Sequence, residues 1–137
     1  MIQGGIHEQY DLAFYKEIFS AIKTNFPHIY LHACSPAEID SLAKREKISV
    51  YDTIVELKEA GLQSLPGAAE ILVDEHRDKV SPRKLKSREW VAVMEGIHRA
   101  GMRATATMTF GMGESLADRI EHLFVIRDLQ DRTGVFL

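Results

Sequence analysis

The sequence predicts an α/β fold built from parallel (β/α) units, and three observations carry this prediction. Short apolar segments recur about every 30 to 35 residues, and each is followed by a longer stretch with apolar residues at helical spacing. Capping residues mark where most of these helices begin and end. Turns that contain glycine, serine or glutamate follow the strands, as the loops of a (β/α) barrel do.

A partial barrel is the predicted architecture. The chain has 137 residues, whereas a complete (β/α) barrel needs ~250. The sequence begins at the end of one predicted strand and stops at the beginning of another, so we expect a single partial barrel domain over residues 1–137, cut at both ends. A flavodoxin-like doubly wound sheet fits the length better and is the alternative. Against it, there is no phosphate loop and no glycine fingerprint.

The first strand and helix are defined by a cap and a proline. Residues 1–5 are expected to be the end of a strand and its turn, and Asp11 then N-caps a helix of about 15 residues that Pro27 terminates. Residues 28–34 form a short strand. The apolar face of this helix is expected to comprise Phe14, Ile18, Ala21, Ile22 and Phe26.

Two further helices begin at serine caps. Ser35-Pro-Ala-Glu38 is a capping box with proline at the first helical position, and its helix ends near Glu46. Ser49 begins the next helix, which closes at Gly61 because glycine readily takes the left-handed conformation at a helix end.

The middle of the chain repeats this order. Residues 63–66 form a very short strand, 67–70 a turn, and 71–80 an amphipathic helical stretch. Residues 81–86 are a polar, proline-containing loop. Ser87 is expected to cap the next helix, which Gly101 ends; its buried face comprises Trp90, Val93, Met94 and Ile97.

The last predicted strand leads into the most informative turn. Residues 103–110 alternate β-branched and small or apolar side chains and are expected to form a buried strand. Ser115 begins the last helix, Gly134 ends it, and residues 135–137 are the onset of another strand. The residues of this helix expected to pack inward are Ile120, Leu123, Phe124 and Ile126.

Between that strand and the last helix lies Gly111-Met-Gly-Glu114, which has the composition of a ligand-binding turn. Gly111 and Gly113 let the backbone approach a ligand closely, and Glu114 offers an acceptor for hydroxyl or amino groups. The N–H groups that open the next helix point into the same space. The alternative is an ordinary βα corner in which the glycines only make the turn.

Charge and cysteine content exclude several classes of function. The 17 Lys and Arg are interspersed with 20 Asp and Glu, so no basic track for nucleic acid is present. The sequence has neither a membrane-length apolar run nor a signal peptide, and we expect a cytoplasmic protein. Cys34 is the single cysteine, which excludes an intramolecular disulfide and a multi-cysteine metal site built from this chain alone. No acid–base pair, nucleophilic triad or metal-spaced histidine set appears.

Several segments resemble, in order and spacing, the core of one branch of the radical S-adenosylmethionine (SAM) enzymes. That branch contains the dehypoxanthine futalosine cyclase and the aminofutalosine synthase of the menaquinone pathway, together with the deazaflavin (F0) synthase subunit. The segments span nearly the whole chain: 3–5 (QGG), 32–38 (HACSPAE), 64–73 (SLPGAAEILV), 81–84 (SPRK), 89–90 (EW), 106–108 (ATM), Arg119 with His122, and 127–134 (RDLQDRTG).

The resemblance implies part of a (β/α) barrel that holds SAM and a [4Fe-4S] cluster and generates a 5′-deoxyadenosyl radical. The family's Cys-x3-Cys-x2-Cys loop is absent from this sequence, and Cys34 is not its equivalent. We therefore expect the chain to bind no cluster and to be inactive unless another chain supplies the missing part. The implied substrate is a futalosine derivative or a flavin precursor, and Gly-Met-Gly-Glu in place of the family's commoner Gly-His-Val-Glu favours the cyclase.

The resemblance also suggests binding residues. Gln3, Gly4 and Gly5 match the glycine turn that meets the amino group of SAM, and Gly111 with Glu114 matches the turn that meets adenine. The candidate substrate-binding residues are His32, Ser35, Glu38 and Glu70.

Each substrate-binding candidate has a structural alternative. His32 could be a core histidine, and Ser35 with Glu38 completes a capping box. Glu70 is expected at the barrel mouth, positioned for ribose hydroxyls, although its turn is one residue shorter than in most relatives. Gly5, Glu70 and Glu114 are expected to open onto one shared hollow. Residues expected to be solvated or stabilising are Arg119, His122, Arg127 and Asp131.

A function of another class remains an alternative. The chain would then be a non-catalytic half-barrel that dimerises or acts as a scaffold, with a partner covering its exposed sheet edges and apolar flank.

Overall fold

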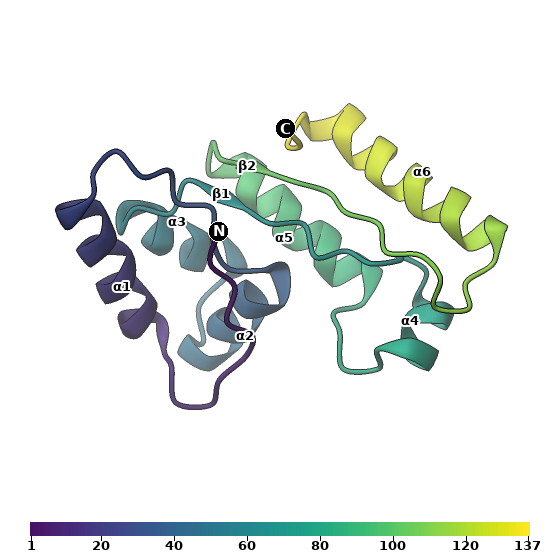
Figure 1. The fold of residues 1–137 in the computed structure, drawn as a ribbon, viewed down its shortest axis with the longest axis horizontal. Coiled ribbons are helices and arrows are strands. Elements are labelled where there is room, and N and C mark those ends of the chain that lie inside the picture. The colour runs from purple at the N-terminus through teal and green to yellow at the C-terminus, as the bar shows by residue number, and fades with distance from the viewer.

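The computed structural model describes residues 1–137 and contains six helices and a two-stranded parallel sheet. The helices are α1 (Leu12–Asn25), α2 (Pro36–Glu46), α3 (Val50–Glu59), α4 (Asp74–Val80), α5 (Ser87–Arg99) and α6 (Leu116–Thr133). The strands are β1 (Ser64–Leu65) and β2 (Arg103–Ala104). Figure 1 shows the strands crossing in front of α3 and α5, with α1 and α6 at the two sides. None of the helices combines the length and the apolar character needed to cross a membrane.

Single-residue bridges extend the small sheet into an array of five parallel segments. The neighbouring pairs are Ile2 with Ala33, His32 with Ser64, Ser64 with Arg103, and Ala104 with Phe136. Neighbouring segments are consecutive in the sequence, and at least one helix separates each pair along the chain. This confirms the parallel strand–helix units. A doubly wound sheet reverses its strand order, and this array does not, so its order argues against the flavodoxin-like alternative.

The hydrophobic core lies between this array and the helices. The segments contribute buried Leu31, Ala33, Leu65 and Ala104, and the helices contribute buried residues that include Ile39, Ile54, Trp90 and Ile97. Alternate side chains of an extended segment point to opposite faces. His32, Ser64 and Arg103 therefore project from the face away from the core, and we call this the polar face of the array. No helix lies in front of β1 and β2 in Figure 1.

The predicted helix caps are largely confirmed because they depend on local hydrogen bonds. Asp11 Oδ1 accepts from the N–H of Phe14, and the hydroxyls of Ser35, Ser49 and Ser115 accept from backbone N–H groups of α2, α3 and α6. Ser87 is an exception. It is the first residue of α5 rather than its cap, and its N–H and hydroxyl donate to Asp74 Oδ1 at 2.7 and 2.8 Å.

Several predicted strand and helix bounds are too generous. Residues 28–34 pair only at His32 and Ala33, and α4 begins at Asp74 rather than at residue 71. The 103–110 strand is paired in the sheet only at its first two residues, and residues 105–110 are half-buried or exposed, not buried. Threonine side chains replace part of the ladder there. The Thr105 and Thr107 hydroxyls accept from the N–H groups of Gly67 and Ala69 at 3.0 and 3.1 Å.

The predicted apolar faces of the first and last helices are partly wrong. In α1 the buried residues are Leu12 and Phe19, whereas Ala21 and Phe26 are exposed. In α6 the buried residues are His122 and Leu129, whereas Ile120, Leu123 and Phe124 are 46%, 53% and 48% exposed. Both helices lie at an edge of the fold, where few neighbours are present to cover them. Four residues form what we call the α6 stripe: Leu116, Ile120, Leu123 and Phe124.

Candidate functional site

The carboxyl ends of the parallel segments meet at one edge of the array, which is where ligands bind in parallel α/β folds. Residues 3–5 follow the first segment, Ser35 follows the second, 66–70 follow β1, and 105–114 follow β2. The candidate residues therefore come from four different segments. The polar loop at 81–86 crosses above the same edge.

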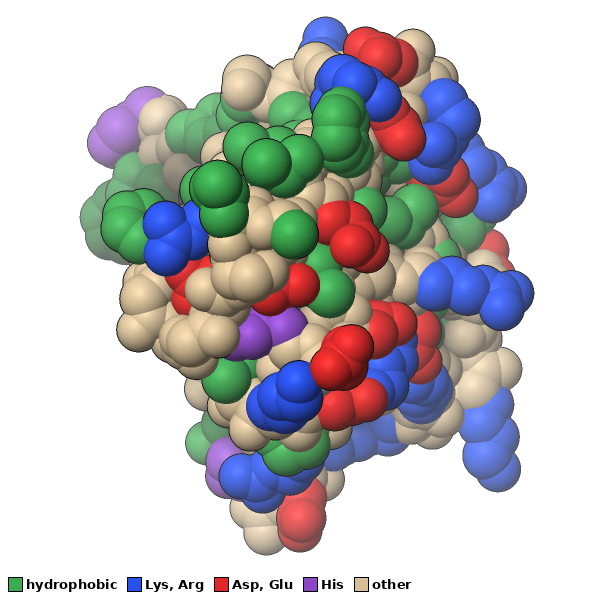
Figure 2. Space-filling model, turned by 90° about the vertical axis from the view of Figure 1, so that its right-hand side faces the viewer, with side chains coloured by type: hydrophobic (Ala, Val, Ile, Leu, Met, Phe, Trp, Pro, Cys, Tyr) green, Lys and Arg blue, Asp and Glu red, His purple; other side chains and the backbone are tan.

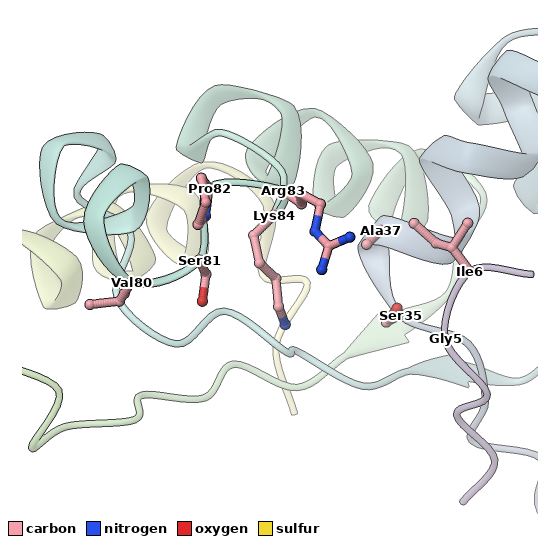
Figure 3. Close-up of a pocket in the computed structure, with 9 residues that line it drawn as sticks. All are labelled: Gly5, Ile6, Ser35, Ala37, Val80, Ser81, Pro82, Arg83 and Lys84. Atoms are coloured by element: carbon pink, nitrogen blue, oxygen red, sulfur yellow. The ribbon is translucent and has the colours of Figure 1, made fainter.

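A hollow of about 500 Å³ opens at this edge. It is lined by Gly5, Ile6, Ser35, Ala37, Val80, Ser81, Pro82, Arg83 and Lys84. Figure 3 shows Arg83 extending from the 80–84 loop toward Ala37, with Lys84 beside it and Ser35 and Gly5 on the other side of the hollow. The lining contains two cations and no acid, so the hollow favours an anionic group such as a carboxylate. The structure thus brings Gly5 and Ser35 together and adds the 81–84 loop, a segment of the resemblance to which the sequence had assigned no binding role.

Glu38 fastens the N-terminal turn to helix α2 beside the hollow. Its carboxylate accepts from the N–H of Gly4 at 3.2 Å and from the Ser35 hydroxyl at 2.7 Å. The side chain is 3% exposed. Glu38 therefore holds the position of residues 3–5, and the ligand-facing groups here are Ser35 and the backbone of Gly5. Gln3 is exposed.

Glu70 reaches the wall of the hollow through Lys84. The Lys84 ammonium lies 2.8 Å from Glu70 Oε1, and the second carboxylate oxygen is buried without a partner. The backbone of Glu70 is in the left-handed region, with a φ of 52°. A buried oxygen without a donor is costly, and a ligand hydroxyl would satisfy it.

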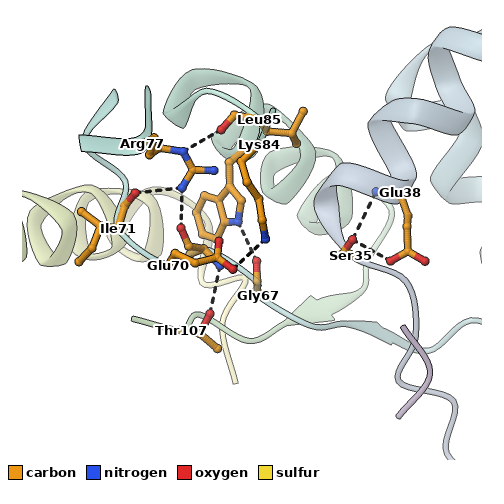
Figure 4. A network of polar contacts seen from close by, with 11 residues as sticks. Ser35, Glu38, Gly67, Glu70, Ile71, Arg77, Lys84, Leu85 and Thr107 are labelled. Carbon is orange, nitrogen blue, oxygen red and sulfur yellow. Dashed lines mark hydrogen bonds and ion pairs between the residues drawn. The ribbon is translucent and has the colours of Figure 1, made fainter. Parts of the chain in front are cut away.

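Two buried side chains hold the 67–71 turn that presents Glu70 (Figure 4). Arg77 donates to the carbonyl oxygens of Ala69, Ile71 and Leu85 at 2.6, 2.9 and 2.8 Å. Trp90 Nε1 donates to the carbonyl oxygen of Gly67 at 2.8 Å. In the sequence, Arg77 is only a cation within a short amphipathic stretch, and nothing there indicates this role.

The Gly111–Glu114 turn closes on itself instead of joining the hollow. Glu114 accepts from the N–H groups of Gly111 and Met112 and from Arg119 Nε, each at 2.8 Å. The Gly111 N–H is the leading cause that lowers the pKa of Glu114 to about 2. Of the three residues expected to share one hollow, only Gly5 lines it; Glu70 contacts the lining residue Lys84 without lining the hollow itself, and Glu114 does neither. Its carboxylate is used internally, and a ligand contact here would come from the turn's backbone.

Two residues of helix α6 that were expected to be solvated or stabilising make structural contacts. Arg119 is an ion-pair partner of Glu114. His122 is fully buried, and its Nδ1 accepts from the N–H of Leu72 at 3.1 Å. It therefore ties α6 to the turn that carries Glu70.

His32 lies one residue before the buried end of the second segment. Its Nδ1 is 2.6 Å from the Ser64 hydroxyl oxygen, and the ring is half-buried. Burial lowers the pKa of His32, the N-terminal ammonium adds to this shift, and the Ser64 backbone opposes it. The imidazole is therefore neutral at pH 7.

This chain does not hold the groups that a [4Fe-4S] cluster needs. No three His, Cys, Asp or Glu side chains lie close enough together to share a metal ion. Cys34 is buried, and burial raises the pKa of its thiol, so it stays protonated and is a poor ligand.

Comparison with known proteins identifies relatives along the whole chain. A cyclic dehypoxanthine futalosine synthase of Streptomyces coelicolor is 43% identical over 99% of this chain and 34% of its own length. A second synthase of this name, from Halalkalibacterium halodurans, is 41% identical over 99% of this chain and 37% of its own length. A 5-amino-6-(D-ribitylamino)uracil–L-tyrosine 4-hydroxyphenyl transferase of Methanospirillum hungatei is 41% identical over 96% of this chain and 36% of its own length. The chain thus spans about a third of the length of the curated relatives it matches. No family model matches the sequence.

Proposed function

We propose that this chain, which is homologous along its length to these radical SAM enzymes, forms the SAM- and substrate-binding portion of such an enzyme. One observation carries the proposal. Segments that resemble the family, at residues 3–5, 32–38 and 81–84, supply Gly5, Ser35, Ala37 and Ser81–Lys84 to the lining of a single hollow at the carboxyl ends of the parallel array, and Glu70 of the 64–73 segment contacts Lys84 there. That convergence is expected of a ligand site in a partial (β/α) barrel.

The residues around the hollow fit SAM. Gly5 has a φ of 76°, and no atom lies within 4 Å of the position where its side chain would begin, so a ligand amino group can approach this turn. Arg83 on the wall of the hollow suits a carboxylate, and the Glu70 oxygen, buried beside Lys84, would reach a ribose hydroxyl if that ion pair moved. SAM would supply the hydrogen-abstracting radical, and these side chains would bind and orient it. The cluster that reduces SAM does not fit the residues of this chain, so we assign it to none of them.

Among the related enzymes, we propose the dehypoxanthine futalosine cyclase. The Gly-Met-Gly-Glu turn supports this choice, and the identities of 41% to 43% apply to both enzyme types. In the intact enzyme the reaction would abstract hydrogen from the sugar and close the ring. The alternatives are the F0 synthase subunit, whose relatives act on 5-amino-6-(D-ribitylamino)uracil and tyrosine, and aminofutalosine synthase. Tighter binding of dehypoxanthine futalosine than of 5-amino-6-(D-ribitylamino)uracil would support the cyclase, and the reverse order would contradict it.

Calorimetric titration of the chain with SAM tests the proposal. We expect saturable binding with one site, weakened about tenfold by Glu70→Gln because the amide accepts hydroxyls less strongly than the carboxylate. Glu75→Gln is the matched control, since Glu75 is exposed on α4 outside the hollow. Absence of saturable binding, or an equal effect of the two substitutions, would count against the assignment.

A second candidate function rests on the α6 stripe. The four apolar residues are 46% to 71% exposed. Figure 2 shows the side of the molecule that is on the right in Figure 1, and hydrophobic side chains gather on its upper part. A contiguous apolar surface of this kind favours association, as a dimerising, non-catalytic half-barrel would require. Light scattering after size exclusion decides this. A dimer that Leu123→Gln dissociates would support the candidate, and a monomer at all concentrations would eliminate it.

A further inference from the structure

The polar face of the array carries a row of three side chains in adjacent register. His32 pairs with Ser64, and Ser64 pairs with Arg103 on the next segment. Each is flanked by residues buried on the opposite face, such as Leu31, Ala33 and Leu65. The row therefore points away from the core, toward the space that a barrel encloses.

Ser64 has one hydrogen-bonding partner for its hydroxyl, and that partner is His32. The Oγ to Nδ1 distance is 2.6 Å, and Ser64 is fully buried. The carbonyl oxygen of Ser64 accepts from the N–H of Ala33 at 3.2 Å, and the hydroxyl makes no hydrogen bond to any oxygen. If Nδ1 carried the ring proton, the serine hydrogen would be buried without an acceptor, which is costly.

The hydroxyl therefore donates to Nδ1, and a neutral ring then carries its proton on Nε2. We propose that Ser64 is a positioning residue that fixes His32 in this tautomer, so that Nε2–H donates to a hydroxyl or carbonyl oxygen of the substrate. This inference rests on the proposed function, because it takes the polar face to be the substrate side of the array. The sequence does not indicate that Ser64 positions His32, because Ser64 is there only a residue of a short predicted strand.

The neighbouring charges define the ligand class. Arg103, on the other side of Ser64, is exposed and donates to the carbonyl oxygen of Gly134. No carboxylate is among the groups that perturb His32. The row thus offers a neutral donor beside a cation, which suits an oxygen-rich, uncharged or anionic group such as a sugar or polyol and disfavours a cationic one.

Nitrogen-15 NMR of the histidine rings tests the tautomer directly. At pH 8 we expect the His32 signals, assigned by their loss in His32→Gln, to show a protonated Nε2 and an unprotonated Nδ1. Ser64→Ala should give a mixture of tautomers, and Ser64→Thr should restore one form because it keeps the hydroxyl. Ser41→Ala, a half-buried serine on α2, is the matched control. Circular dichroism establishes that each variant folds.

Binding of dehypoxanthine futalosine to the same variants tests the ligand role. We expect Ser64→Ala to weaken binding about tenfold and Ser64→Thr to retain it. A proton on Nδ1 in the unmodified chain, or unchanged affinity in Ser64→Ala, would overturn this inference while leaving the proposed function intact. Absence of binding to the unmodified chain would contradict the proposed function and the ligand role of His32 together.

Discussion

The buried guanidinium of Arg77 donates to the carbonyl oxygen of Ala69 over 2.6 Å and, through the same nitrogen, to that of Ile71. These two contacts fix both sides of Glu70, the residue whose carboxylate faces Lys84 at the hollow. A residue of helix α4 therefore sets the geometry of the turn that follows β1.

Removing this guanidinium should destabilise the fold. Arg77→Met leaves three carbonyl oxygens without their donor, and we expect it to lower the free energy of unfolding by about 3 kcal/mol. Arg88→Met, on the exposed side of α5, should change it by less than about 0.5 kcal/mol. Urea unfolding followed by circular dichroism measures both. Equal stabilities would show that Arg77 does not hold the turn.

Gly67 is predicted to be intolerant of any side chain. A Cβ there would lie 2.6 Å from the carbonyl oxygen of Thr105 and 3.0 Å from two further backbone atoms. Because backbone must move, Gly67→Ala should lower the free energy of unfolding by about 2 kcal/mol.

Gly4→Ala is the control for that substitution. The nearest atom to its Cβ is Glu38 Oε1 at 3.9 Å, an ordinary contact distance, so we expect a change below about 1 kcal/mol. Thermal melts of the two variants side by side measure the difference. If Gly67→Ala and Gly4→Ala have the same melting temperature, the close approach of the 67–70 and 105–109 backbones is wrong.

His122 predicts a loss of stability in mild acid. Burial lowers the pKa of His122 below its ordinary value of 6.5, and the charge of Arg77 adds to this shift. The unfolded chain then binds the proton more tightly, so stability is fully present above about pH 6.5 and falls as the pH decreases toward the folded pKa. Glu114 contributes in a separate window, because its stabilisation is lost only as the pH falls from about 4.5 toward 2.

Urea unfolding at pH 7.5 and pH 5.5 checks this prediction. We expect His122→Gln, which keeps an acceptor for the N–H of Leu72, to lose less stability between the two values than the unmodified chain. His32 shifts in the same direction and is present in both proteins, so the difference isolates His122. An identical pH dependence would refute the assignment.

The sequence predicted those parts of the fold that local chemistry determines. Asp11, Ser35, Ser49 and Ser115 cap the helices expected of them, and Gly134 ends α6 with a φ of 63°. The face that α6 buries was not predictable in the same way. Burial depends on which neighbours are present, and at this edge only a narrow strip around His122 and Leu129 is covered.

The site was predicted in part for a similar reason. Gly5 and Ser35 follow strands, so their convergence follows from a parallel array. The roles of Arg77, Ser64 and the 81–84 loop depend on contacts between segments distant in sequence, which no local pattern encodes. Glu114 shows the converse. Its turn has the composition of a ligand turn, yet its carboxylate is fully used by Gly111, Met112 and Arg119.

The central claim is that one hollow at the carboxyl ends of the array binds SAM. Titration of the nitrogen-15-labelled chain with SAM, followed by amide chemical shifts, tests it most directly. We predict that Gly5, Ser35, Glu70 and Lys84 shift together with one dissociation constant, while Gln63 and Gly101, outside the hollow, do not move. Shifts that are absent, or that centre on Gln63 and Gly101, would contradict the account.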